Sequence, residues 1–143
     1  MNTIVENIRN AWFANNLPPD RLQIIPPFRR GEHLAALAAL ADVALDTANY
    51  GGGMTSFEAL AAGLPLIHGP GGDKIMIQRA GGSCLLAAGL SDLVVETVPS
   101  YVDLAVQIGS DETYRSDIKA RFKHKLERAT QAFSVLKYVS RHW

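Results

Sequence analysis

The sequence predicts an α/β fold: a Rossmann-like, three-layer domain built on a parallel sheet and followed by C-terminal helices. Short apolar segments alternate with helical segments of about ten residues, which is the pattern of crossover units on a parallel sheet. The composition indicates one globular core, since 48% of the 143 residues are apolar and 20% are charged. Three consecutive glycines, Gly51–Gly53, stand between an apolar segment and the next helix, where such sheets bind ligands.

The first half of the chain predicts a helix, a strand, a helix and a second strand. Residues 3–15 carry apolar side chains every three to four positions, as an amphipathic helix does. The segment RLQIIP, residues 21–26, predicts a short strand that prolines end. Residues 31–41 return to a helical period, with Leu40 expected on the buried side. DVALD, residues 42–46, predicts a short strand buried in the sheet.

The alternation continues beyond the glycines. Residues 54–63 predict a helix closed by Gly63, and LPLIH, residues 64–68, predicts another strand. Two short helices are expected next, one over residues 74–82 and one beginning at Cys84.

The C-terminal part predicts three helices. The first follows Pro99, with Ser100 as its cap. A charged helix is expected over residues 111–126 and an amphipathic one over residues 133–143. Acidic residues interleave with the basic ones of the charged helix, which favours a solvated face over a nucleic-acid surface.

We expect one domain over residues 1–143. A sheet-and-helix region would span residues 1–97, and C-terminal helices would span residues 98–143.

Charge and cysteine content exclude several classes of function. Fourteen acidic residues balance fourteen basic ones, so no net charge attracts nucleic acid or an anionic membrane. The single cysteine, Cys84, forms no intrachain disulfide and lies in no metal-ligand spacing. Neither a signal peptide nor an apolar run long enough to span a bilayer is found. We therefore expect a cytoplasmic protein.

The glycines could form an anion site. Glycine permits positive φ and close approach of the backbone to a ligand, and a helix start offers unpaired N–H groups to a phosphate. Thr55 and Ser56 add hydroxyl donors, and Glu58, one turn later, can accept hydrogen bonds from a sugar diol. The spacing matches neither G-x-G-x-x-G nor a P-loop. From spacing alone, a phosphate cradle and an ordinary strand-to-helix turn both remain open.

Three further polar residues lie near the expected sheet edge. Asp46 ends a strand and is expected to orient the glycines by accepting N–H bonds. His68 follows the next strand, either in contact with a ligand or as a loop histidine. Arg79 could pair with a phosphate or form a surface ion pair.

Nearly the whole chain, from about Asp20 to Trp143, resembles the C-terminal lobe of O-GlcNAc transferase and its bacterial and plant SPINDLY-like relatives, and we expect a bacterial member. The most specific segments are LADVALDT, residues 40–47, and EALAAGLP, residues 58–65. MIQRAGGSCL and YVDLAVQIGSDETY are similar to later segments of that lobe.

This resemblance implies a GT-B glycosyltransferase, in which two Rossmann-like lobes face each other across a cleft. The C-terminal lobe holds the donor, a UDP-sugar carrying GlcNAc or another hexose. Transfer is inverting, with protein hydroxyls as acceptors, and needs neither a metal nor another cofactor.

The resemblance also assigns donor-binding positions. The turn cups the diphosphate, Glu58 binds the ribose, and Arg30 and His33 lie against the base. A methionine, Met54, stands where the family often has threonine. The complete donor-binding set is Gly52, Gly53, Met54, Thr55, Glu58, Arg30, His33 and Arg79. No catalytic residue is assigned.

The chain begins with a helix, whereas a doubly wound sheet normally opens with a strand. We therefore expect a partial donor lobe, inactive alone and completed by a missing N-terminal lobe or by a second copy of the chain. The alternative is a non-catalytic Rossmann-like binding or assembly module, acting through dimerisation or a partner chain.

Overall fold

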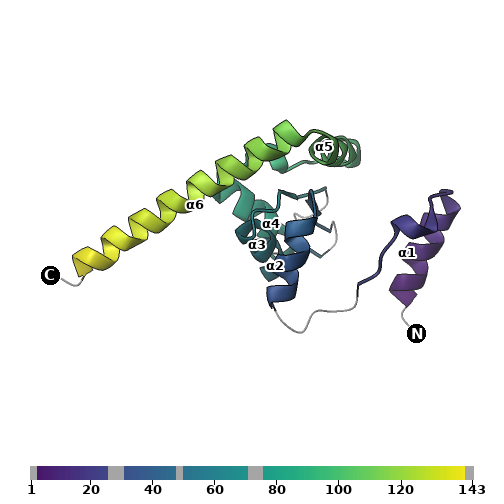
Figure 1. The fold of residues 1–143 in the computed structure, drawn as a ribbon, viewed down its shortest axis with the longest axis horizontal. Helices are drawn as coiled ribbons and strands as arrows, with labels where there is room; N and C mark the ends of the chain where they lie inside the picture. The colour runs from purple at the N-terminus through teal and green to yellow at the C-terminus, as the bar shows by residue number, and fades with distance from the viewer. Residues whose placement is uncertain (1–2, 26–30, 48–49, 71–75, 141–143) are drawn as a thin grey trace.

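The computed structural model describes residues 3–25, 31–47, 50–70 and 76–140, with side chains omitted at 31–35, 76–77, 126 and 128–140. Figure 1 shows the arrangement of the elements. The α-helices of the described ranges are α1 (Thr3–Ala14), α2 (Gly31–Leu40), α3 (Met54–Ala61), α4 (Met76–Ala87), α5 (Val98–Ser110) and α6 (Glu112–Ser140). The shorter elements are the 3-10 helices η1 (Pro19–Arg21) and η2 (Ser91–Leu93) and the strands β1 (Ala44–Leu45) and β2 (Leu66–Ile67).

The sheet is small and parallel. β1 pairs with β2 in parallel, with Ala44 opposite Leu66. His68 continues the pairing through a parallel bridge to Val94. The described residues are mostly helical, so the predicted α/β architecture is confirmed in part: the sheet is parallel and helices connect its strands.

The core forms around β2. Successive side chains of a strand point to opposite faces, and Leu66 and Ile67 are both buried, so both faces of β2 are covered. Helices α3 and α5 both contact this strand. Each fully buried Leu or Ile contributes about 1.5–3 kcal/mol. The core cluster consists of Leu60, Leu66, Ile67, Leu85, Leu90, Leu93, Leu104, Ile108 and Ile118.

Helices α3 and α4 end in the same way. Gly63 has φ +78° and Gly89 has φ +70°, the left-handed conformation that glycine adopts most easily. After α3, the Gly63 N–H bonds to the Leu60 carbonyl at 2.8 Å and the Leu64 N–H to the Ala59 carbonyl at 3.0 Å. This is the Schellman arrangement, so the predicted closure by Gly63 is confirmed.

Three predictions for the first half are wrong. The strand expected to be buried at residues 42–46 forms as β1, but its Leu45 side chain is 54% exposed because no described strand covers that edge. Residues 22–25 are not a strand, because no neighbouring strand of the described chain pairs with them; Pro26 lies outside the described residues. Leu40 is 85% exposed rather than buried. Helix α2 instead turns Ala38 inward, where it packs with Ala59 and Leu64.

Helix boundaries in the second half also differ from the predicted ones. Helix α4 is continuous where two helices were expected, and α6 continues through the expected break after residue 126. Helix α5 begins at Val98, so Pro99 lies in its first turn, where no N–H is required. Its cap is Thr97 rather than Ser100: the Thr97 hydroxyl accepts from the Ser100 N–H at 3.2 Å.

Helices α1 and α6 extend away from the core. In Figure 1, α1 stands apart from the other helices and α6 extends beyond them on the opposite side. Helix α1 has no buried residue. Within the described ranges, no helix combines the length and apolar character needed to cross a membrane.

Candidate functional site

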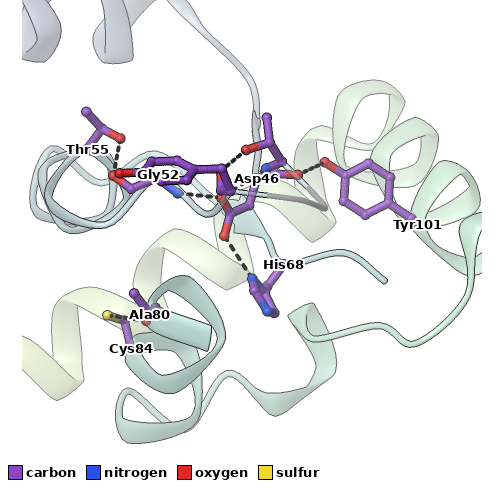
Figure 2. Close-up of polar contacts among 9 residues, drawn as sticks. Asp46, Gly52, Thr55, His68, Ala80, Cys84 and Tyr101 are labelled. Carbon is purple, nitrogen blue, oxygen red and sulfur yellow. Dashed lines mark hydrogen bonds and ion pairs between the residues drawn. The ribbon is translucent and has the colours of Figure 1, made fainter. Parts of the chain in front are cut away.

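The site is organised by Asp46, the residue that follows β1. Its Oδ1 atom accepts hydrogen bonds from the backbone N–H groups of Thr47, at 3.0 Å, and Gly52, at 2.8 Å (Figure 2). Asp46 is only 7% exposed, and these donors offset the cost of burying its carboxylate. The predicted orienting role of Asp46 is therefore confirmed.

The second carboxylate oxygen of Asp46 faces His68. The His68 Nδ1 lies 2.8 Å from Asp46 Oδ2. Because the two residues follow the paired strands β1 and β2, the parallel register brings them together. His68 is buried, with 7% exposure, so it is not an exposed loop histidine.

Helix α4 approaches this pair closely because of two glycines. A Cβ atom on Gly81 would lie 2.3 Å from Asp46 Oδ2, and one on Gly82 would lie 2.6 Å from the His68 ring. Any larger side chain at either position would require Asp46 or His68 to move. The sequence pattern gives no sign of this role, since adjacent glycines predict a helix boundary.

A tyrosine from α5 completes the group. The Tyr101 hydroxyl donates to the backbone carbonyl of Asp46 at 2.8 Å (Figure 2). Gly69 makes room for the ring, since a Cβ there would lie 2.6 Å from it. Burial raises the pKa of the Tyr101 phenol, and the negative charge of Asp46 raises it further, so the donor stays protonated at neutral pH. Tyr101 is 55 residues from Asp46, and no local pattern in the sequence indicates the contact.

The glycine turn, residues Gly51–Thr55, has its own steric requirements. A Cβ atom on Gly52 would lie 2.5 Å from the Ser56 hydroxyl oxygen and 2.8 Å from that of Thr55. Gly53 has φ +49°. The Gly52 carbonyl accepts from both the N–H and the hydroxyl of Thr55, at 2.9 and 2.5 Å. Two of the three glycines are thus required by the shape of the turn itself.

Unpaired N–H groups gather at the start of α3. The Gly52 N–H is occupied by Asp46, but those of Gly53, Met54 and Ser56 have no acceptor among the described residues. The positive end of the helix dipole lies at the same place. The arrangement can therefore hold an anion through backbone donors.

The surroundings of the turn are open and largely apolar. Met54 is 70% exposed, and Tyr50 and Phe57 are also exposed. Glu58, one turn further along α3, is exposed as well.

A cavity of about 430 Å³ lies beside the turn, between α2, β1 and α3. Buried Ser56 is one of its few polar lining residues, and the rest of the wall is mostly aliphatic. The aliphatic lining residues are Leu37, Ala38, Ala41, Val43, Ala44, Leu45, Ala59, Leu64 and Leu66.

The structure describes part of the predicted donor-binding set. The turn residues and Glu58 lie on one continuous segment. Arg79 is exposed on α4 and makes no ion pair with a described residue. Arg30 lies outside the described residues, and of His33 only the backbone, in α2, is described. No group of three or more His, Cys, Asp or Glu side chains suited to a metal ion is found in the described part of the chain.

The chain is similar to known proteins of one family. A family model described as glycosyl transferase family 41 matches residues 3–142. A Petunia hybrida protein described as a probable UDP-N-acetylglucosamine–peptide N-acetylglucosaminyltransferase SPINDLY is 29% identical over 113 residues. A Caenorhabditis elegans UDP-N-acetylglucosamine–peptide N-acetylglucosaminyltransferase is 31% identical over 116 residues. The resemblance to O-GlcNAc transferase and SPINDLY-like proteins is confirmed.

The chain spans a small share of these relatives. The aligned parts are 79% and 81% of this chain but 12% and 10% of the petunia and nematode proteins. A solved mutant O-GlcNAc transferase from Thermobaculum terrenum matches with a TM-score of 0.76 and 32% identity, over 86% of this chain and 23% of that one.

Proposed function

Because the chain belongs to glycosyl transferase family 41, we propose that it is the donor-binding part of a GT-B enzyme that transfers a sugar from a UDP-sugar to a protein acceptor. The proposal includes GlcNAc or another hexose as the sugar and inversion at the anomeric carbon. Relatives with the names given above support the substrate class. The single observation that carries the site is the set of three N–H groups, where the turn enters α3, that have no acceptor in the described part of the chain.

In this proposal the diphosphate of the donor lies over the start of α3. The N–H groups of Gly53, Met54 and Ser56 bind its oxygens, and the helix dipole adds favourable potential. As the sugar leaves, negative charge grows on the diphosphate, and donors already fixed in position stabilise it without rearrangement. Glu58 is exposed one turn away and accepts from the ribose hydroxyls.

We propose that this chain supplies only part of the enzyme, because it covers a small share of its relatives' length. We assign residues 1–143 to one partial donor-binding domain, with a sheet-and-helix region to residue 97 and C-terminal helices from residue 98. The acceptor-binding and catalytic groups would lie on the other lobe. We also propose a cytoplasmic location, on the cysteine content alone.

Calorimetric titration tests the donor site. UDP, UDP-sugars and GDP-sugars are titrated against the folded chain, and we expect UDP and a UDP-sugar to bind. Glu58→Ala should weaken UDP binding roughly tenfold, because a hydrogen bond to a charged group is lost. Glu127→Ala, another exposed helical glutamate, is the matched control and should leave the affinity unchanged.

Two results would contradict this proposal in different ways. If no nucleotide or nucleotide-sugar binds the folded protein, the donor-site assignment is wrong. If UDP binds but Glu58→Ala and Glu127→Ala behave alike, only the ribose assignment is wrong.

A second candidate function, the assembly module, is favoured by the outer edge of β1. The N–H groups of Ala44 and Asp46 bond to the carbonyls of Pro65 and Ile67, so the N–H and carbonyl of Leu45 point to the opposite edge, where no described strand pairs with them. Leu45 is also 54% exposed. Self-association of the chain without any nucleotide binding would support this function instead.

A further inference from the structure

Resting on the proposed donor site, we propose that His68 and Tyr101 are positioning residues for the glycine turn and act on it through Asp46. Neither side chain bonds to the turn itself. Each bonds to Asp46, and Asp46 holds the N–H of Gly52.

The two contacts fix Asp46 from different sides. His68 engages Oδ2, which sets the rotation of the carboxylate and leaves Oδ1 aimed at the Gly52 N–H. Tyr101 engages the backbone carbonyl, which fixes the peptide plane at the end of β1. Holding Gly52 in this direction orients the start of the turn, and the N–H groups of Gly53, Met54 and Ser56, which have no acceptor among the described residues, follow it along the chain.

Asp46, His68 and Tyr101 form a hydrogen-bonded network, and three glycines of the surrounding backbone leave space for it. Gly69 is in contact distance of the Tyr101 ring, and Gly81 and Gly82 are in contact distance of Asp46 and His68. The network is therefore held by close approach of two further segments of the chain, in addition to its hydrogen bonds. Small displacements of Asp46 are resisted by this packing and would be transmitted to the turn.

Positioning and general stabilisation predict different results. A residue that merely stabilises the fold should affect all ligands of the folded protein equally, or none. A residue that positions the glycine turn should affect the ligands that carry a diphosphate and spare the nucleoside.

The test compares UDP, inorganic pyrophosphate and uridine by calorimetry on Tyr101→Phe, at a temperature where melting curves show the protein folded. We expect UDP and pyrophosphate to bind about fivefold more weakly, the effect of one lost hydrogen bond, with uridine unchanged. Tyr114→Phe is the matched control: Tyr114 packs against the same core, and its hydroxyl bonds to no described residue.

A pair of substitutions at His68 extends the test. His68→Asn keeps an N–H donor near the position of Nδ1 and should retain most of the UDP affinity, whereas His68→Leu removes the donor and should not. If His68→Leu fails to fold, Tyr101→Phe still decides. The positioning role is overturned if Tyr101→Phe leaves UDP affinity intact or weakens UDP and uridine equally. A wild-type chain that binds no UDP overturns the proposed function instead, and this inference with it.

Discussion

Gly52 and Gly53 are adjacent glycines that the turn requires for different physical reasons. At Gly52 the φ angle is ordinary, but the hydroxyls of Thr55 and Ser56 occupy the space where a Cβ would lie. At Gly53 the space is open, but φ is +49° and ψ is −117°, a combination that side chains disfavour. The glycines therefore shape the turn, and the N–H groups of Gly53, Met54 and Ser56, which lack an acceptor among the described residues, are what an anion would use.

This difference gives a stability prediction for Gly53→Ala. Because nothing lies within 4 Å of the new Cβ, the substitution tests backbone strain alone, and we expect the free energy of unfolding to fall by about 1–3 kcal/mol. Gly109→Ala is the matched control, since it also meets open space but lies in α5 with an ordinary φ. It should leave the stability unchanged or raise it by up to about 1 kcal/mol. Equal effects in urea denaturation would contradict the strain argument.

The role of a site residue could be predicted from the sequence where its hydrogen-bond partners lie close to it along the chain. Asp46 could be assigned an orienting role because a carboxylate at a strand end, six residues before a glycine, can reach the following N–H groups. His68 and Tyr101 are 22 and 55 residues away, and only the folded register brings them to Asp46. A short-range pattern carries no information about such contacts.

Helices and strands were likewise predicted correctly where the cause is local, and incorrectly where it depends on contacts between distant segments. The limits of α3 could be predicted because Gly53 and Gly63 set them through their own backbone conformations. The local sequence of residues 21–26 could not decide whether they form a strand, since a strand forms only when a neighbouring strand pairs with its backbone. Helix α4 continues through Gly81 and Gly82 because packing against Asp46 and His68 outweighs the low helix propensity of glycine.

Helix α6 is attached to η2 by a bidentate ion pair. Arg121 donates to both carboxylate oxygens of Asp92, at 2.6 and 2.9 Å. The hydrogen bonds from Arg121 lower the pKa of Asp92 below its ordinary 3.8. Both side chains are more than a third exposed, so solvent screening limits the pair to less than about 1 kcal/mol.

The lowered pKa sets the direction of a pH dependence. A carboxylate with a lower pKa in the folded state stabilises the fold above its unfolded pKa and loses that contribution as the pH falls through the folded value. We expect Asp92→Asn to be slightly less stable than wild type at pH 7, with the difference shrinking below about pH 4. Thermal melts over this range check it, with Asp103→Asn, which forms no ion pair with a described residue, as the control. A difference that is constant with pH would show that the ion pair does not contribute.

The stabilising contacts are unevenly distributed over the described residues. The largest fully buried apolar side chains lie in β2, in α4 and the segment after it, and in α5 and α6. In contrast, Ile4, Ile8 and Phe13 of α1 are exposed, and the 12-residue helix buries none of its side chains. A helix of this length is marginal in water without tertiary contacts.

Hydrogen exchange should follow this distribution. We expect the amides of α1 to exchange near the rate of an unfolded chain, because only helical propensity protects them, and the amides of β2 and of residues 85–90 to exchange only on global unfolding. Mass spectrometry of proteolytic fragments separates the two regions. Low concentrations of urea should accelerate exchange in β2 and leave that of α1 almost unchanged, since α1 has little protection to lose. Equal protection of α1 and β2 would contradict the prediction and would mean that α1 docks stably on the core through its exposed isoleucines.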